Sequence, residues 1–142
     1  MKIRGVTGSK PTFVSSGALH ADVPYEYAAI AAPGSTVFTA GACPLDADGV
    51  VVAPGDYEEQ ARVAVANLLT SLAAAGASAQ DLVKTTVYVA ARSREDLVCV
   101  WRIVEAAFAP ARPPSTLLGV ALLGYPDQLV EIEGIASLPE AT

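Results

Sequence analysis

The strongest constraint on the fold is a helix-forming segment that is followed closely by a strand-forming segment. Small and aliphatic residues recur at helical spacing from Ala61 to Leu72, and Asp56 stands before them as a candidate N-cap. Gly76 suits the position just beyond a helix end, because glycine readily adopts the left-handed conformation needed there. Residues 82–89 are rich in β-branched and aromatic residues and predict a strand. A helix followed by such a strand indicates a layered α/β domain.

A second helix and four further strands complete the predicted order. Ser93 is a candidate N-cap with Asp96 three positions on, and Pro110 ends the apolar stripe that follows. Strands are predicted at residues 27–32, 37–40, 116–123 and 129–136, and residues 1–24 are predicted to be irregular. The order β-β-α-β-α-β-β, without an internal repeat or a linker, predicts one α/β (α+β) domain over residues 1–142.

Two helices can cover only one face of a sheet of this size. We expect the other face to be apolar and to carry Val87, Leu117 and Leu122. An exposed apolar face needs a partner, so the chain is expected to form an oligomer.

Composition disfavours several classes of protein. Hydrophobic residues make up 52% of the chain and charged residues 17%, which argues against intrinsic disorder. The formal net charge of −6 disfavours contact with a phosphate backbone, so no nucleic-acid partner is expected. No apolar run reaches the roughly 18–20 residues of a membrane span, and no apolar stretch follows residues 1–4 as in a signal peptide. The expected location is the cytoplasm, with no membrane partner.

Cysteine and histidine are too few to build a metal site. Cys43 and Cys99 form no CxxC pair and have no histidine close by, and His20 is the single histidine of the chain. A zinc site needs three or four such ligands. No metal is therefore expected, and the two cysteines are interpreted as small, buried apolar residues.

Several segments resemble those of the Rid (reactive intermediate deaminase, YjgF-like) family in order and spacing. They are residues 37–41, the stretch from Gln60 to Val89, and residues 129–136, and the resemblance covers roughly residues 24–137. It implies a chorismate-mutase-like fold with one mixed sheet and two helices on one face. It also implies homotrimers, in which the sheets form a central barrel and clefts lie between subunits. The implied activity is hydrolysis of reactive enamines and imines to a keto acid and ammonia, without cofactor or metal.

In deaminating members of this family, an arginine begins the strand after the second helix and grips the substrate carboxylate through two parallel hydrogen bonds. The resemblance places Ser115 at that position, followed by Thr116 and Leu117. Serine cannot supply a charged fork, and losing two charge-assisted bonds costs roughly 3–6 kcal/mol. The loss corresponds to about two to four orders of magnitude in carboxylate affinity. Arg112, three residues earlier, is the one nearby cation that could replace the arginine.

The resemblance implies roles for further residues. Glu131 matches the family's acidic residue, which positions the attacking water or assists proton transfer, and its alternative is a solvent-facing strand residue. Tyr25 matches a tyrosine near the cleft mouth, or it is a packing residue. Trp101 stands where several deaminating members have asparagine, and it is either a core residue or part of a more aromatic pocket. A cleft wall is expected from Ala40, Gly41 and Cys43.

Three functions remain open. The first is a divergent Rid enzyme that acts on a small or medium organic metabolite, imine-like or enamine-like, by Glu-assisted acid/base chemistry. The second is an ordinary imine deaminase in which Arg112 replaces the arginine that binds the substrate carboxylate. The third is a non-catalytic ligand-binding or regulatory trimer. The candidate catalytic residues are Glu131, Ser115, Thr116 and Tyr25, and the candidate substrate-binding residues are Leu117, Arg112, Trp101, Ala40, Gly41 and Cys43.

Overall fold

The computed structural model describes residues 10–141, and its elements follow the predicted order with one strand added at the start. The strands and helices are β1 (Thr12–Val14), β2 (Ala28–Ile30), β3 (Thr36–Phe38), α1 (Tyr57–Ala74), a short 3₁₀ helix (Ala79–Asp81), β4 (Leu82–Val89), α2 (Arg94–Phe108), β5 (Ser115–Gly119) and β6 (Val130–Ser137).

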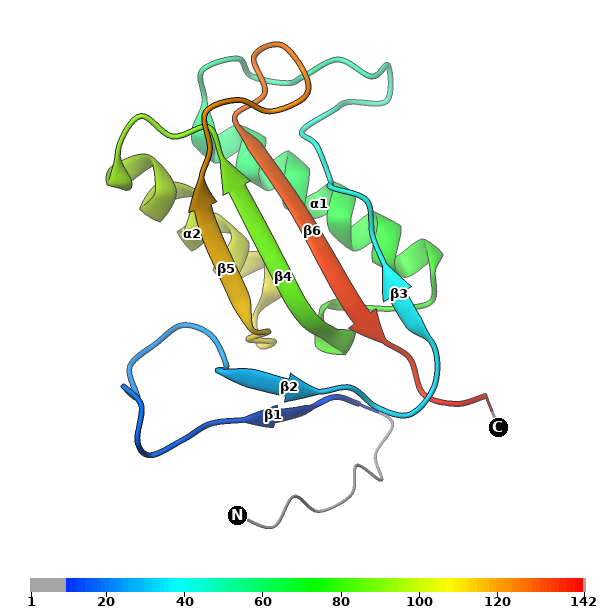
Figure 1. The fold of residues 1–142 in the computed structure, drawn as a ribbon. Helices are drawn as coiled ribbons and strands as arrows, with labels where there is room; N and C mark the ends of the chain where they lie inside the picture. The colour runs from blue at the N-terminus through cyan, green and yellow to red at the C-terminus, as the bar shows by residue number, and fades with distance from the viewer. Residues whose placement is uncertain (1–9, 142) are drawn as a thin grey trace.

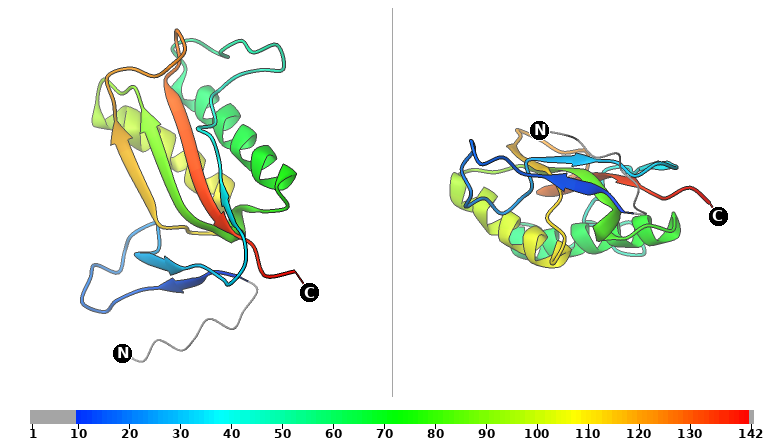
Figure 2. Two further views of the ribbon diagram at one scale, coloured as in Figure 1. Left: turned by 45° about the vertical axis from the view of Figure 1, so that its right-hand side comes forward. Right: turned by 90° about the horizontal axis from the view of Figure 1, so that it is seen from below.

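The main layer is a four-stranded mixed sheet in the order β3-β6-β4-β5 (Figure 1). Strands β4 and β5 run parallel, whereas β6 is antiparallel to both β3 and β4. Both helices lie on one face of this sheet, as the view from below in Figure 2 shows. The predicted α+β architecture, with one mixed sheet and two helices on one face, is confirmed. No helix within residues 10–141 combines the length and apolar character needed to cross a membrane.

The N-terminal part of the chain differs from the prediction. Residues 12–14 were expected to be irregular but form β1, which pairs with β2 in a separate two-stranded sheet (Figure 1). The predicted strand over residues 27–32 is therefore shorter and lies outside the main sheet. Both strands have three residues, which is too short for an alternating pattern to stand out in the sequence.

Sequence-local signals set the helix ends as predicted. The Asp56 carboxylate accepts a hydrogen bond from the backbone N–H of Glu59 at 3.0 Å, which caps α1. Gly76 follows this helix with φ of 79°, a conformation that glycine adopts without strain. Ser93 and Asp96 form the predicted reciprocal capping box at the start of α2.

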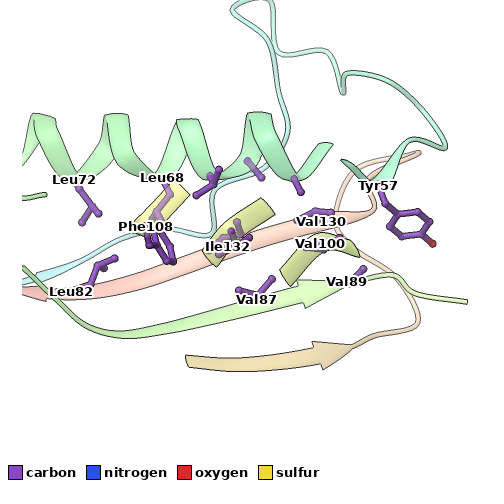
Figure 3. Packing of buried hydrophobic residues seen from close by; sticks show 14 of the residues in the cluster. Tyr57, Leu68, Leu72, Leu82, Val87, Val89, Val100, Phe108, Val130 and Ile132 are labelled. Atoms are coloured by element: carbon purple, nitrogen blue, oxygen red, sulfur yellow. The ribbon is translucent and has the colours of Figure 1, made fainter. Parts of the chain in front are cut away.

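The core is the layer between the two helices and the sheet. Figure 3 shows Leu68 and Leu72 of α1 facing side chains from the sheet. The fully buried aliphatic residues of this layer include Leu68, Leu72, Leu82, Val87, Val89, Val100, Val104, Val130 and Ile132. Each such side chain stabilises the fold by about 1.5–3 kcal/mol relative to full exposure. The helices and the central strands β4 and β6 therefore form one packed unit.

The prediction of an apolar open face was wrong in its residues. Val87 is fully buried and points toward the helices, as Figure 3 shows, and Leu117 packs against the same core. Leu122 lies beyond the end of β5 and is 85% exposed. Strand alternation leaves mainly polar residues of β4 and β6 on the opposite face, namely Lys84, Thr86, Tyr88, Glu131 and Glu133. A register shift between Leu82 and Lys84 helps to set which residues of β4 face the helices and which face the other way.

One ion pair joins the N-terminal hairpin to the core unit. The ammonium of Lys10 donates to the buried carboxylate of Asp81 at 2.7 Å. Asp81 also accepts hydrogen bonds from the backbone N–H and the hydroxyl of Ser78. Burial acts to raise the pKa of the Asp81 carboxyl, but the bonds from Lys10 and Ser78 outweigh it and leave the pKa below its ordinary value.

Replacement of Asp81 by asparagine is expected to lower the free energy of unfolding by about 1–3 kcal/mol at neutral pH, because Lys10 and Ser78 lose a buried, charged acceptor. A group with a depressed folded-state pKa contributes stability above its unfolded pKa, and this contribution is lost as the pH falls through the folded pKa. Urea unfolding from neutral to acidic pH should therefore show a smaller acid loss in Asp81→Asn than in the wild type.

The matched control is Asp48→Asn, a change in an exposed turn. It should leave both the unfolding free energy and its pH dependence close to those of the wild type. An Asp81→Asn variant with wild-type stability at neutral pH would show that the carboxylate does not hold the hairpin to the core.

Candidate functional site

A hollow of about 420 Å³ opens where the start of β5 meets α2 and the N-terminal loop. Its lining is largely apolar, and none of the lining residues carries a charge: they are Pro24, Tyr25, Trp101, Ser115, Thr116 and Leu117. Five of these six residues were predicted as site residues from the sequence. We call this hollow the edge pocket, because β5 is the edge strand of the main sheet.

Ser115, the residue expected at the position of the family's arginine, has its hydroxyl engaged within the chain. This hydroxyl donates to the carbonyl of Pro113 at 2.9 Å and lies 2.5 Å from the hydroxyl oxygen of Thr85. Because a serine has one proton to donate, these bonds leave no free donor on Ser115. The Ser115 hydroxyl therefore stabilises the start of β5 and is not free to donate to a ligand.

The Thr116 hydroxyl, in contrast, has a cationic neighbour, Lys84, which was not predicted from the sequence. The ammonium of Lys84 donates to the hydroxyl oxygen of Thr116 at 2.6 Å. Lys84 reaches it from the open face, where it lines a smaller hollow of about 150 Å³ with Glu133 and Phe38. Within residues 10–141 the Thr116 hydroxyl proton has no acceptor, so it is available to a ligand.

Trp101 belongs both to the core and to the edge pocket. Its ring packs against the buried cluster and also lines the pocket. Its indole N–H is buried and, among the residues that the structure describes, has no hydrogen-bond acceptor. The two interpretations made from the sequence are therefore compatible.

Tyr25 forms part of the pocket wall, as expected. Its ring meets that of Tyr27 edge to face, with the centroids 5.9 Å apart. Tyr27 in turn donates from its hydroxyl to the carbonyl of His20 at 2.8 Å. The loop between β1 and β2 thus brings Tyr25 to β5 through its own internal contacts.

Arg112 is exposed and does not line the edge pocket. Its guanidinium donates to the carbonyl of Val23, and its own carbonyl accepts from the N–H of Glu26 at 2.9 Å. It lines a neighbouring hollow of about 330 Å³ formed with residues of the β1–β2 loop. Arg112 therefore bonds to that loop and lines a different hollow from Ser115.

Glu131 lies on the open face of β6, next to the predicted wall residues. A Cβ atom at Gly41 would lie 1.8 Å from the Glu131 carboxylate oxygen Oε1, so only glycine fits there without moving the carboxylate. The side-chain amide of Gln128, which is 4% exposed, donates to the other oxygen of Glu131 at 3.4 Å. Gln128 was not predicted, because no motif marks it.

Cys43 completes this second group, which we call the glutamate group and define as Gly41, Cys43, Gln128 and Glu131. Burial raises the pKa of the Cys43 thiol, the charge of Glu131 raises it further, and a hydrogen bond with Gln128 partly offsets both. Ala40 precedes Gly41 in the same segment, and Ala42 bridges to Ile132 of β6. The expected wall of residues 40–43 thus lies beside Glu131.

The glutamate group and the edge pocket do not meet within one chain. Thr116 is in register with Thr86, which pairs with Glu133, so Thr116 and Glu133 lie two strands apart. With neighbouring strands about 4.8 Å apart and about 3.4 Å per residue along a strand, Glu131 lies about 12 Å from Thr116. No group of three potential metal-ligating side chains occurs among the residues that the structure describes.

These features define an α+β protein with two helices on one face of a four-stranded sheet and candidate site residues at its edge and on its open face. The family model described as Endoribonuclease L-PSP matches residues 15–138. The chain belongs to this family, whose members are also named Rid and RutC proteins. The predicted family and its chorismate-mutase-like fold are thereby confirmed.

Known relatives share most of the chain. A RutC family protein of Pyrococcus abyssi is 32% identical over 103 residues, which cover 72% of this chain and 79% of the relative. The 2-iminobutanoate/2-iminopropanoate deaminase of Salmonella typhimurium is 37% identical over 106 residues, which cover 72% and 80%. The crystal structure of a Rid family protein of unknown function from Yersinia pestis has a TM-score of 0.85 and 29% identity, covering 91% of this chain and 99% of that chain.

Because the charge of Glu131 raises the pKa of Cys43, a Glu131→Gln variant should have a lower Cys43 pKa. In a Cys99→Ser background, the rate of alkylation by iodoacetamide should then rise at lower pH than in the parent. Glu133→Gln is the matched control, because its carboxylate is engaged by the Tyr88 hydroxyl at 2.6 Å. An unchanged Cys43 profile in Glu131→Gln would contradict the close approach of these two side chains.

Proposed function

We propose that this protein binds a small organic metabolite with an imine or enamine group and hydrolyses it by acid/base chemistry at Glu131. The proposal places the reaction in a cleft between two subunits of a homotrimer. The observation that carries it is the division of the site. The edge pocket can hold a ligand but has no carboxylate or imidazole in its lining, and the glutamate group supplies a carboxylate about 12 Å away on the same chain. A second copy of the chain would bring the two together.

The open face of the sheet supports assembly. Large apolar residues at its edges are solvent-exposed in the single chain, with Phe38 at 74% and Leu118 at 42%. Between them lie the polar residues Lys84, Thr86 and Glu133. A mixed face of this kind suits an interface in which polar groups find partners and apolar residues are covered.

Imine hydrolysis requires addition of water to the C=N carbon and then departure of ammonia. In the proposed reaction the Glu131 carboxylate accepts a proton from water while the water oxygen bonds to carbon, and the proton passes to nitrogen as the C=N π bond breaks. Glu131 then takes the hydroxyl proton of the carbinolamine. The carbonyl forms, the C–N bond breaks, and nitrogen leaves as ammonia with that proton.

The fixed position of Glu131 supports this role. Gly41 leaves room for the carboxylate and the Gln128 amide orients it, so its geometry is set before a substrate arrives. The deaminase of Salmonella typhimurium that this chain resembles is named for 2-iminobutanoate and 2-iminopropanoate. For this chain we propose the same reaction class with a different substrate preference. Ser115 has no guanidinium to bind a substrate carboxylate through two hydrogen bonds, and the Arg112 guanidinium already donates to the carbonyl of Val23.

An assay of imine loss would test the chemistry. An amino-acid oxidase generates imines in solution, and semicarbazone formation reports their lifetime. Wild type should accelerate the loss of imines with short apolar side chains, and Glu131→Gln should reduce this rate by about 100-fold or more. Ser115→Arg should raise the rate of 2-iminopropanoate loss, because a guanidinium that makes two hydrogen bonds to the carboxylate increases carboxylate affinity by about two to four orders of magnitude.

Glu133→Gln is the control for Glu131→Gln, because Glu133 is the next carboxylate on the same face of the same strand. Equal activity of Glu131→Gln and wild type would overturn the catalytic proposal. Ligand-dependent stabilisation without turnover of any imine would favour a binding protein instead.

Subunit complementation would test the shared cleft. Glu131→Gln lacks the acid, and Leu117→Trp is designed to fill the edge pocket, so each homotrimer should be inactive. Trimers refolded from a mixture should regain activity, because some clefts combine an intact pocket with an intact Glu131. A monomer in sedimentation, or mixed trimers without activity, would contradict the proposal.

A further inference from the structure

A partly buried cation lies beside the edge pocket. The ammonium of Lys84 on β4 donates to the hydroxyl oxygen of Thr116 on β5 at 2.6 Å, and Thr116 lines the edge pocket. Thr116 is also the register partner of Thr86, which lines the small hollow that contains Lys84. Neighbouring strands are about 4.8 Å apart, so the two linings are one strand spacing apart and the Lys84 side chain bridges them.

The charge of Lys84 is not balanced by a carboxylate of the same chain. No ion pair joins it to an acidic side chain among residues 10–141. Glu133 lines the same small hollow, but it belongs to β6, which lies on the other side of β4 from Thr116 (Figure 1). The Glu133 carboxylate instead accepts from the hydroxyl of Tyr88 at 2.6 Å. A partly buried ammonium has lost part of its hydration, so an anion that reaches it gains a charged partner.

Lys84 and Thr116 together present two adjacent donors. The ammonium has three protons, and within the described part of the chain only Thr116 accepts one of them. The Thr116 hydroxyl accepts from Lys84, so its own proton can be donated to a ligand. Two donor atoms 2.6 Å apart can serve the two oxygens of one carboxylate, as two nitrogens of a guanidinium do. Only one of the two donors is charged, so the pair is a weaker carboxylate site than a guanidinium.

We infer that Lys84 and Thr116 bind the carboxylate of the substrate, and that the remainder of the substrate lies in the edge pocket. The inference deepens the proposed function and rests on it for the reaction, since it assigns a substrate-binding residue at the same site. Recognition of the carboxylate then comes from β4 and not from the start of β5, where the Ser115 hydroxyl is bonded within the chain. Lys84 takes the part for which Arg112 was the candidate, because the Arg112 guanidinium donates to Val23.

Binding of a stable keto acid and its amide would test the inference. The probes are 2-oxobutanoate, the product of 2-iminobutanoate hydrolysis, and 2-oxobutanamide, which has the same shape without the charge. By calorimetry, wild type should bind the acid about tenfold or more tightly than the amide, because only the acid gains a charge-assisted bond.

Lys84→Met keeps the length of the side chain and removes its charge. Its affinity for 2-oxobutanoate should fall about 10- to 100-fold, the change that corresponds to one lost charge-assisted bond. Its affinity for 2-oxobutanamide should stay close to that of wild type. Lys84→Arg restores the charge and should recover most of the affinity for the acid.

A further variant and a control complete the experiment. Thr116→Val keeps the shape of the side chain, removes the second donor and should weaken binding of the acid about tenfold. Arg94→Met is the matched charge control, because it removes one positive charge from the exposed first turn of α2. This control should bind both probes as wild type does.

Equal affinity of wild type for the acid and the amide would overturn the inference, whether or not any variant folds. Lys84→Met with wild-type affinity for the acid would overturn it as well. If the subunits of that variant also separate in sedimentation, Lys84 pairs with a carboxylate of a neighbouring copy instead.

These readouts need no turnover, so the inference and the proposed function can fail separately. Acid-selective binding through Lys84 in a protein that hydrolyses no imine would refute the enzyme proposal alone. Imine hydrolysis that depends on Glu131, with the same KM in Lys84→Met as in wild type, would refute the inference alone.

Discussion

The structure depends on the apolar layer between the two helices and one face of the sheet. Leu68 and Leu72 from α1 and Val100 and Val104 from α2 meet aliphatic residues of β4 and β6 there, and all of these are fully buried. Because strand residues alternate between faces, filling this layer also decides which residues face the other way. Glu131 lies on the open face because Val130 and Ile132, its neighbours in β6, are needed in the core.

The fold was largely predictable because its signals are local. Asp56, Gly76 and the capping box at Ser93 set helix ends through backbone geometry that the sequence states directly. The N-terminal hairpin was not predictable in this way, since its pairing joins two short segments across a long loop. The face on which Val87 lies was not predicted either. Which residues of β4 face the helices depends on the pairing register of β4 with β6, including the shift near Leu82.

The candidate site was also predictable only in part. Family resemblance indicated Tyr25, Trp101 and residues 115–117, and the structure brings these together around one pocket. It could not reveal that the Ser115 hydroxyl is already bonded, that Lys84 supports Thr116, or that Gln128 orients Glu131. These relations join side chains from different strands and loops, so they exist only after the chain has folded.

The close approach between Gly41 and Glu131 has a consequence for how this protein can change. Any side chain at Gly41 would collide with the carboxylate, with a Cβ atom only 1.8 Å from Oε1. The two positions therefore form an epistatic pair: a larger residue at one becomes acceptable only after the other has shortened or turned away. A mutational path that retains Glu131 in its present orientation must also retain Gly41, whereas a path that gives up the carboxylate frees this segment to accept larger side chains.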